Sequence, residues 1–316
     1  MSRKIKTILI GTSLNPPSDD VVKAGLGIAR ATGARICLVH AFLPQVIYSG
    51  GGAPFVTPVL ADEVAKSERM LLTRRLDEQV KRLGIRPEEL AGTVIEYGPP
   101  HRSLIDTAQK VGADLIVVGA TESPRMAKLF GSTAERVVRK ATRPVLTVRG
   151  TRAMPPKRVL LPVDLSPLSA DAFRQGLRVL DQILPARDAA LEAFFVMTEY
   201  DRQGLAPEAA PELSDANAGR ELSRFVETNA KNTGWTVATK VSMGYADEEI
   251  LARMEEWAPD LIVLGTHGRG GFERFLLGSV ASSVVRNAGT SVLVIPPEAA
   301  LEESLAREAE LQGMRV

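Results

Sequence analysis

The sequence predicts two α/β domains in tandem, each with a five-stranded parallel sheet of Rossmann-like type. Three observations lead to this expectation. Short apolar runs alternate with amphipathic segments of helical spacing, which is the order of βαβ units. Several motifs occur twice, in the same order and about 150 residues apart, so the chain reads as a domain duplication. Gly and Pro in Arg149–Pro156 mark a boundary between the copies.

The repeated segments suggest where each domain begins and ends. They predict one domain over residues 1–150, a second over 157–297 and a C-terminal tail over 298–316. The matching pairs are KTILIGTSLNP (6–16) with KRVLLPVDLSP (157–167), DLIVVG (114–119) with DLIVLG (260–265), and GSTAERVVRK (131–140) with GSVASSVVRN (278–287).

Each expected strand is a short apolar run rich in Val, Ile and Leu, bounded by Gly, Pro or charged residues. Each expected helix has an apolar stripe at spacings of three and four residues. The strands are expected at 7–11, 35–41, 91–96, 114–119 and 145–148, then at 158–163, 190–197, 236–241, 261–264 and 292–295. The helices are expected at 18–32, 61–83 and 100–111, then at 169–184, 215–233 and 247–257, with one more after each GS pair.

The last strand of each copy is expected to be a sheet edge, because it is short and followed by Gly or Pro. An edge needs a partner, so Val145–Val148 is predicted to pair with Val292–Ile295 about a pseudo-two-fold axis. Residues 1–150 hold 22 Lys and Arg against 14 Asp and Glu, and the remainder holds 17 against 24. Opposite net charges favour docking of the two halves as an intramolecular pseudo-dimer. A larger homodimer is left open.

Composition excludes several classes of protein. The 316 residues are 45% hydrophobic and 24% charged, as in an ordinary soluble protein with sizeable cores. No apolar run is long enough for a membrane span, and the N-terminus lacks signal-peptide features, so a cytoplasmic location is expected. A net charge of +1 gives no support for nucleic-acid binding. The single cysteine, Cys37, is expected to be buried, and three separated histidines offer no metal site.

The richest stretch in functional signals runs from Leu261 to Ile295. Gly265, Gly268 and Gly278 lie between an expected strand and an expected helix, at the edge of the sheet where ligands bind in open α/β folds. Glycines let the backbone approach a flat base or a phosphate, and the start of a helix attracts anions. Ser279 is expected to cap this helix and offer its hydroxyl to a phosphate.

This pattern, G-x2-G-x9-G-[ST] together with PVD at 162–164, resembles that of the universal stress protein family. The resemblance covers both halves and omits only the tail. It implies an adenine-nucleotide alpha-hydrolase-like fold in each half and binding of ATP, or of ADP or AMP, in the half with the full motif. Magnesium would accompany the nucleotide.

Carried over by position, the family pattern implies a base and ribose side of the site. Asp164 would accept hydrogen bonds from the adenine amino group or the ribose hydroxyls. The other residues implied on this side would line the edge, lie against the base or flank the nucleotide: Pro162, Val163, Met197, Leu264 and Gly265.

The resemblance also implies a phosphate side. Gly268 would open the phosphate loop. Independently of the resemblance, Arg269 lies in the loop between the glycines, where its charge is expected to screen the phosphates. Gly278, Ser279 and Val280 would bind phosphates through backbone N–H groups and the hydroxyl.

The first half departs from the pattern. Ser13 stands where Asp164 stands in the second half, and Glu122 replaces Gly268. A carboxylate would repel an approaching phosphate, so the first half is predicted to bind ATP weakly or not at all. Gly131 and Ser132 remain a candidate anion site on their own.

The leading hypothesis is a stress-response regulator in which ATP acts as a conformational switch read by an unknown protein partner. A slow ATPase is the first alternative, but no residue is assigned as catalytic, and His267 is expected to have a packing or loop-capping role. A third hypothesis is a chaperone-like scaffold, with a partner or small apolar ligand under the loop Pro44–Pro58.

The chain lacks a GK[ST] loop and a GxGxxG fingerprint, which disfavours phosphotransferases and dinucleotide oxidoreductases. A phosphoacceptor role for Asp164 is disfavoured because no acidic cluster accompanies it.

Overall fold

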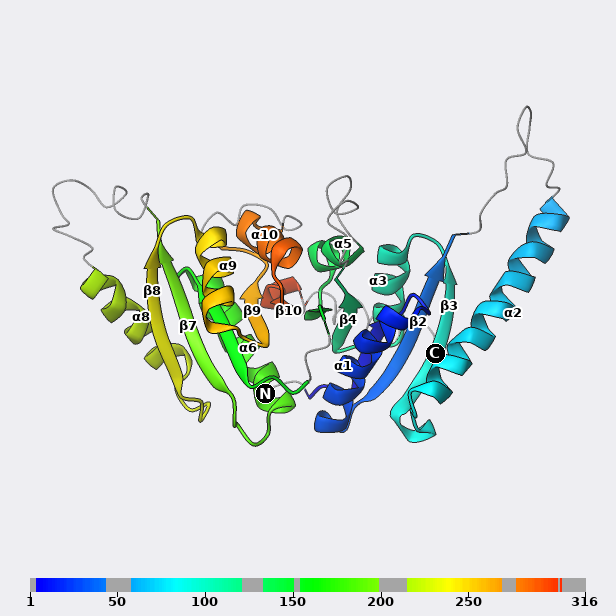
Figure 1. Ribbon diagram of the computed structural model, residues 1–316, viewed down its shortest axis with the longest axis horizontal. Helices are drawn as coiled ribbons and strands as arrows, with labels where there is room; N and C mark the ends of the chain where they lie inside the picture. Colours follow the sequence, from blue (N-terminus) through cyan, green and yellow to red (C-terminus); the bar gives the residue numbers. More distant parts are fainter. Residues whose placement is uncertain are drawn as a thin grey trace, which may run out of the picture.

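A computed structural model of the chain describes residues 4–43, 58–120, 133–150, 154–198, 215–268, 277–300 and 302. Its ten strands form one continuous sheet with the order β3-β2-β1-β4-β5-β10-β9-β6-β7-β8. The two halves lie side by side along the long axis, with α2 and α8 at opposite ends and α5 next to α10 at the centre (Figure 1). The two predicted parallel sheets are therefore joined into one.

The first half contains five strands, all parallel to their neighbours within that half. Its strands are β1 (Thr7–Gly11), β2 (Arg35–Phe42), β3 (Leu90–Tyr97), β4 (Leu115–Gly119) and β5 (Val145–Val148). Its helices are α1 (Pro16–Thr32), α2 (Pro58–Arg82), the 3-10 helix η1 (Pro87–Glu89), α3 (Pro100–Lys110) and α5 (Thr133–Lys140).

The second half repeats this arrangement. Its strands are β6 (Arg158–Val163), β7 (Ala190–Met197), β8 (Val237–Met243), β9 (Leu261–Gly265) and β10 (Ser291–Ile295). Its helices are α6 (Pro167–Ile183), α8 (Asp215–Asn229), α9 (Ala246–Trp257) and α10 (Ser279–Asn287).

The predicted pairing of the two last strands is confirmed. β5 and β10 pair antiparallel, with Leu293 opposite Leu146 and Val294 opposite Val145. Both leucines are 2% exposed. The hydroxyl of Thr147 also donates to the backbone oxygen of Val292, at 3.2 Å. The pairing leaves β3 and β8, rather than β5 and β10, as the edges of the sheet.

Apolar side chains cover both faces of the sheet. One core cluster joins the sheet to α1, α2, α6 and α8, and the other joins it to α3, α5, α9 and α10. Cys37, as predicted, lies buried in the second cluster, and this burial raises the pKa of its thiol to about 11. The result is a three-layer fold with helices on both faces of the sheet.

Several element boundaries differ from the sequence prediction. α1 and α6 begin at Pro16 and Pro167, rather than two residues later, because proline fits the first turn of a helix. The preceding Asn15 and Ser166 cap them, each accepting a hydrogen bond from a backbone N–H in the first turn. α8 ends at Asn229 rather than at Thr233.

The repeated aspartate of the DLIV segments has a structural role. Asp114 accepts backbone hydrogen bonds from Lys6 (2.8 Å) and Thr7 (3.1 Å), at the start of β1. Asp260 does the same at the start of β6, from Lys157 (2.8 Å) and Arg158 (3.0 Å). In each half this carboxylate holds two neighbouring parallel strands together at their amino ends, and the expected ligand site lies at the carboxyl ends.

Candidate nucleotide site in the second half

The candidate site lies where neighbouring strands β6 and β9 end. The helix that follows β6 packs on one face of the sheet and the helix that follows β9 packs on the other, since α6 and α10 belong to different core clusters. The chain thus leaves the two strand ends toward opposite faces of the sheet. Such a switch point is where open α/β sheets bind ligands.

Asp164 is held at the end of β6 by the turn that follows this strand. Its Oδ1 accepts a hydrogen bond from the backbone N–H of Ser166 at 3.0 Å, and its own N–H donates to the hydroxyl of Ser169 at 3.2 Å. Leu165 adopts a left-handed conformation, with φ of 63°, which completes the tight turn. The side chain is therefore oriented before any ligand binds.

Gly268 contacts the carboxylate of Asp164. A Cβ atom at Gly268 would lie 2.4 Å from Oδ2 of Asp164, so only glycine fits without a shift. A Cβ at Gly265 would lie 2.8 Å from that of Ala172 on α6. These two glycines let the loop after β9 pass close to both the carboxylate and the helix.

The start of α10 is anchored to the same loop. The N–H of Gly278 donates to the backbone oxygen of Thr266 at 2.8 Å, and the N–H of Ser282 donates to the oxygen of Gly278 at 2.9 Å. The predicted capping role of Ser279 is wrong: Gly278 is the N-cap residue, with no side-chain cap, and Ser279 is the first helical residue. Ser279 is exposed in this first turn.

The remaining predicted site residues differ in accessibility. Val163, Met197 and Leu264 are 8%, 2% and 7% exposed and contribute to the cores. Pro162 and Val280 are partly exposed. Met197 belongs to the core cluster that joins the sheet to α6 and α8, and its contact with a base stays a prediction. Arg269, predicted to contact phosphates, lies outside the described residues.

His267 packs against its neighbour in the loop. Its Nδ1 lies 2.8 Å from the hydroxyl of Thr266, and the N–H of Thr266 donates to the backbone oxygen of Ile295 at 3.1 Å. These contacts fit the expected loop-capping role. Sequence reasoning missed Thr266, Ser166 and Ser169, although a serine directly before Pro167 is a recognisable start of a helix.

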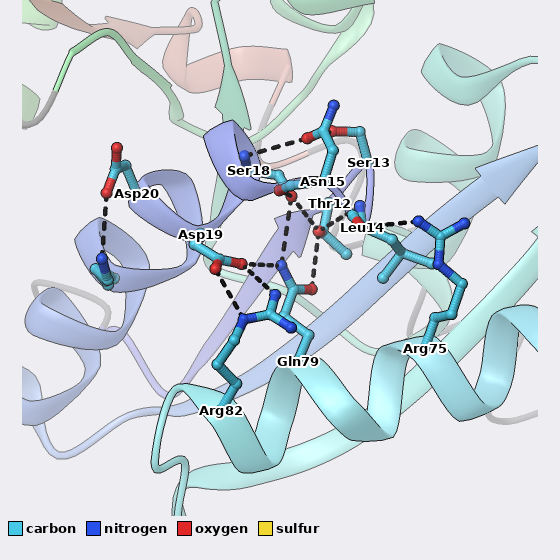
Figure 2. A network of polar contacts seen from close by, with 11 residues as sticks. Thr12, Ser13, Leu14, Asn15, Ser18, Asp19, Asp20, Arg75, Gln79 and Arg82 are labelled. Atoms are coloured by element: carbon cyan, nitrogen blue, oxygen red, sulfur yellow. Dashed lines mark hydrogen bonds and ion pairs between the residues drawn. The ribbon is translucent and has the colours of Figure 1, made fainter.

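The corresponding turn in the first half is held by side chains of α2 (Figure 2). The hydroxyl of Thr12 donates to Oε1 of Gln79 at 2.9 Å, and the amide of Gln79 donates to Asp19 at 2.7 Å. Gln79 is fully buried. Arg82 binds the carboxylate of Asp19 and holds its pKa below the usual range.

The second half cannot repeat the hydrogen bond of Thr12, because the repeat places Val163 at the equivalent position and valine has no hydroxyl. Figure 2 also shows Arg75 of α2 donating to the backbone oxygen of Leu14, at 3.2 Å. Ser13, the counterpart of Asp164, hydrogen-bonds to Asn15 within the turn at 2.5 Å. The predicted Glu122, Gly131 and Ser132 lie outside the described residues.

The sequence profile of the universal stress protein family matches this chain twice, at residues 4–149 and 155–296. The chain belongs to the universal stress protein family. The two matches together span most of its length, so it is a tandem member with one family domain in each half.

Curated relatives have the same assignment. A universal stress protein of Mycolicibacterium smegmatis is 29% identical over 310 residues, which cover 92% of this chain and 97% of the relative. A universal stress protein of Methanocaldococcus jannaschii is 33% identical over 142 residues, covering 44% of this chain and 81% of the relative.

Solved structures share the fold across both halves. The crystal structure of a universal stress protein from Archaeoglobus fulgidus has a TM-score of 0.63 at 18% identity, covering 93% of this chain and 97% of that one. Within the described residues, no helix is long and apolar enough to cross a membrane. The same residues contain no group of three or more His, Cys, Asp or Glu arranged to hold a metal ion.

Proposed function

We propose that this universal stress protein is a regulatory protein that binds one adenine nucleotide in its second half. The contact between Gly268 and the carboxylate of Asp164 carries the proposal. An oriented hydrogen-bond acceptor, the carboxylate of Asp164, thus lies beside the backbone of Gly268 at the switch point of the sheet. A carboxylate there suits the ribose hydroxyls or the adenine amino group, and the missing side chain of Gly268 lets the carboxylate lie against the loop backbone.

The phosphates would lie at the start of α10. The N–H groups of Ser279, Val280 and Ala281 begin the helix and have no intrahelical acceptor. Together with the positive end of the helix dipole they suit an anion, and the exposed hydroxyl of Ser279 adds a donor. Arg269 would cover the outer side of the phosphates, and any magnesium would bind with them.

Nucleotide binding would act as a switch rather than as a step in catalysis. The loop from Gly268 to Gly278 connects the base side of the site to the phosphate side, so a ligand that contacts both favours one arrangement of that loop. A protein partner that reads this surface would respond to stress through nucleotide occupancy. His267, bonded to Thr266, is not proposed as a catalytic base.

Calorimetric titration with ATP and magnesium, followed by a timed assay for ADP, tests this function. We expect one site per chain without turnover. Asp164→Ala should weaken binding by at least about tenfold, which corresponds to ~1.4 kcal/mol. Ser13→Ala changes the equivalent position in the first half and should bind ATP like the wild type.

If Ser13→Ala weakened ATP binding and Asp164→Ala left it unchanged, the nucleotide site would lie in the first half and the proposal would be wrong. Steady release of ADP would favour the ATPase alternative. Absence of ATP, ADP and AMP binding to the wild type would mean that the glycine motif has only a structural role.

A further inference from the structure

Glu135 joins the first half of the chain to the helix at the proposed phosphate site. It lies in the first turn of α5 and is only 3% exposed. On α10 of the other half, the hydroxyl of Ser282 donates to its Oε1 at 3.2 Å. Arg286 donates to both carboxylate oxygens at 3.3 Å. Arg139, on the same helix as Glu135, donates to Oε1 at 2.9 Å.

The repeat shows that this contact is asymmetric. GSTAERVVRK and GSVASSVVRN align Glu135 with Ser282 and Arg139 with Arg286. The two equivalent arginines therefore meet on a single carboxylate. Pairing two second halves would bring Ser282 against Ser282 with no acceptor for the arginines, and pairing two first halves would bring two carboxylates together. The difference between the halves thus favours pairing of the first half with the second.

Ser282 connects this contact to the anion site. Its backbone N–H, bonded to the oxygen of Gly278, makes the first intrahelical hydrogen bond of α10. Its side chain is bonded to Glu135 at the same time. One residue therefore fixes both the first turn of the helix and the position of that turn relative to the first half. A buried hydrogen bond to a charged acceptor is among the stronger polar contacts in a protein.

We infer that Glu135 is a positioning residue for the nucleotide site of the second half, so that the first half orients a site to which it contributes no ligand contact. This inference rests on the proposed function for its consequence in binding. Its structural content, that Glu135 holds the first turn of α10, is independent of any ligand.

Hydrogen exchange of the ligand-free protein tests the structural content first. Glu135→Gln removes the charge, and Ser282→Ala removes one hydrogen bond while keeping the charge. Both should speed amide exchange in α10 several-fold relative to α6. Glu89→Gln is the matched control, because Glu89 is also a buried carboxylate with two arginine partners, Arg30 and Arg86, but lies directly before the edge strand β3, away from α10 at the centre of the sheet. It should leave exchange in α10 unchanged relative to α6.

Titration of the same variants with ATP and magnesium tests the consequence. We expect Glu135→Gln and Ser282→Ala to weaken ATP binding about five- to tenfold, and Glu89→Gln to bind like the wild type. Removing the charge of Glu135 would by itself favour a phosphate, so tighter binding by Glu135→Gln would overturn the inference.

Each remaining outcome is also decisive. Unchanged exchange in α10 would overturn the inference whatever the affinity. Faster exchange with unchanged affinity would overturn it as well, since the position of the turn would not matter to binding. Faster exchange in a protein whose wild type binds no nucleotide would support the positioning role and reject the proposed function.

Discussion

Gly268 and Asp164 come from different loops, and these loops lie close together because Gly268 has no side chain. The carboxylate occupies the space that a Cβ at position 268 would need. Since Oδ1 is oriented by the N–H of Ser166, the carboxylate cannot turn away without losing a hydrogen bond. The site therefore depends on a glycine for steric reasons as well as for backbone freedom.

Gly268→Ala should weaken ATP binding by at least about tenfold, or ~1.4 kcal/mol, because the loop or the carboxylate must move. Gly219→Ala is the control, since a Cβ at this position in α8 would meet nothing within 4 Å. Calorimetric titration measures both, with circular dichroism to establish that each variant is folded. Binding of wild-type strength by Gly268→Ala would contradict the proposed arrangement of the loop.

At the scale of elements, polar contacts at the ends of helices set how each helix meets the sheet. In the first half, Gln79 fixes α2 against the turn after β1 through Thr12 and Asp19. At the amino ends of the strands in the same half, Glu89 of η1 binds Arg30 in the last turn of α1 and Arg86 beside it. The hydrogen bond from Arg30, followed by that from Arg86, holds the pKa of Glu89 far below its usual range.

The charged form of Glu89 therefore stabilises the folded state. Because its pKa is lower in the folded than in the unfolded chain, this stabilisation is present above the unfolded pKa, about 4.3, and is lost as the pH falls through the lower folded value. Glu89→Gln should lower the free energy of unfolding by about 1–3 kcal/mol at pH 7. The difference from wild type should shrink below about pH 4. Urea unfolding at several pH values measures it, and a difference independent of pH would contradict the role of the charge.

At the scale of the molecule, β5 and β10 turn two sheets into one. Leu146 and Leu293 face each other across this pairing and are both buried. The N-terminal segment adds a further link, since the N–H of Ile5 donates to the side chain of Gln182 at 2.7 Å. The hydrogen bond from Arg149 to the backbone oxygen of Arg286, at 3.0 Å, adds another. The two halves are thus expected to unfold together.

Leu146→Asp places a charge between the halves, where its burial without a partner costs several kcal/mol. Calorimetry should show one unfolding transition for the wild type and two, or one at much lower temperature, for the variant. Thr239→Asp adds the same charge on the exposed edge strand β8 and should change the transition little. A single transition of wild-type temperature in Leu146→Asp would show that the pairing is not what couples the halves.

Strand and helix order, the duplication and the pairing of the last strands could all be inferred from sequence, because each depends on local periodicity or on the repeat. Leu261–Leu264, for example, is apolar at every position, as a strand buried on both faces must be. Short-range patterns were less reliable at helix ends. Ser279 resembles a cap residue, but the chain enters α10 through Gly278, whose N–H is already bonded to Thr266.

The sequence by itself determined the family resemblance, the α/β class and the glycines and aspartate of the candidate site. Only the tertiary structure decided that Gly268 contacts Asp164, that Met197 is buried and that Glu135 holds the helix of the other half. The physical reason is distance along the chain. Periodicity and turn chemistry act between near neighbours, whereas these contacts arise only when the sheet brings remote loops and helices together.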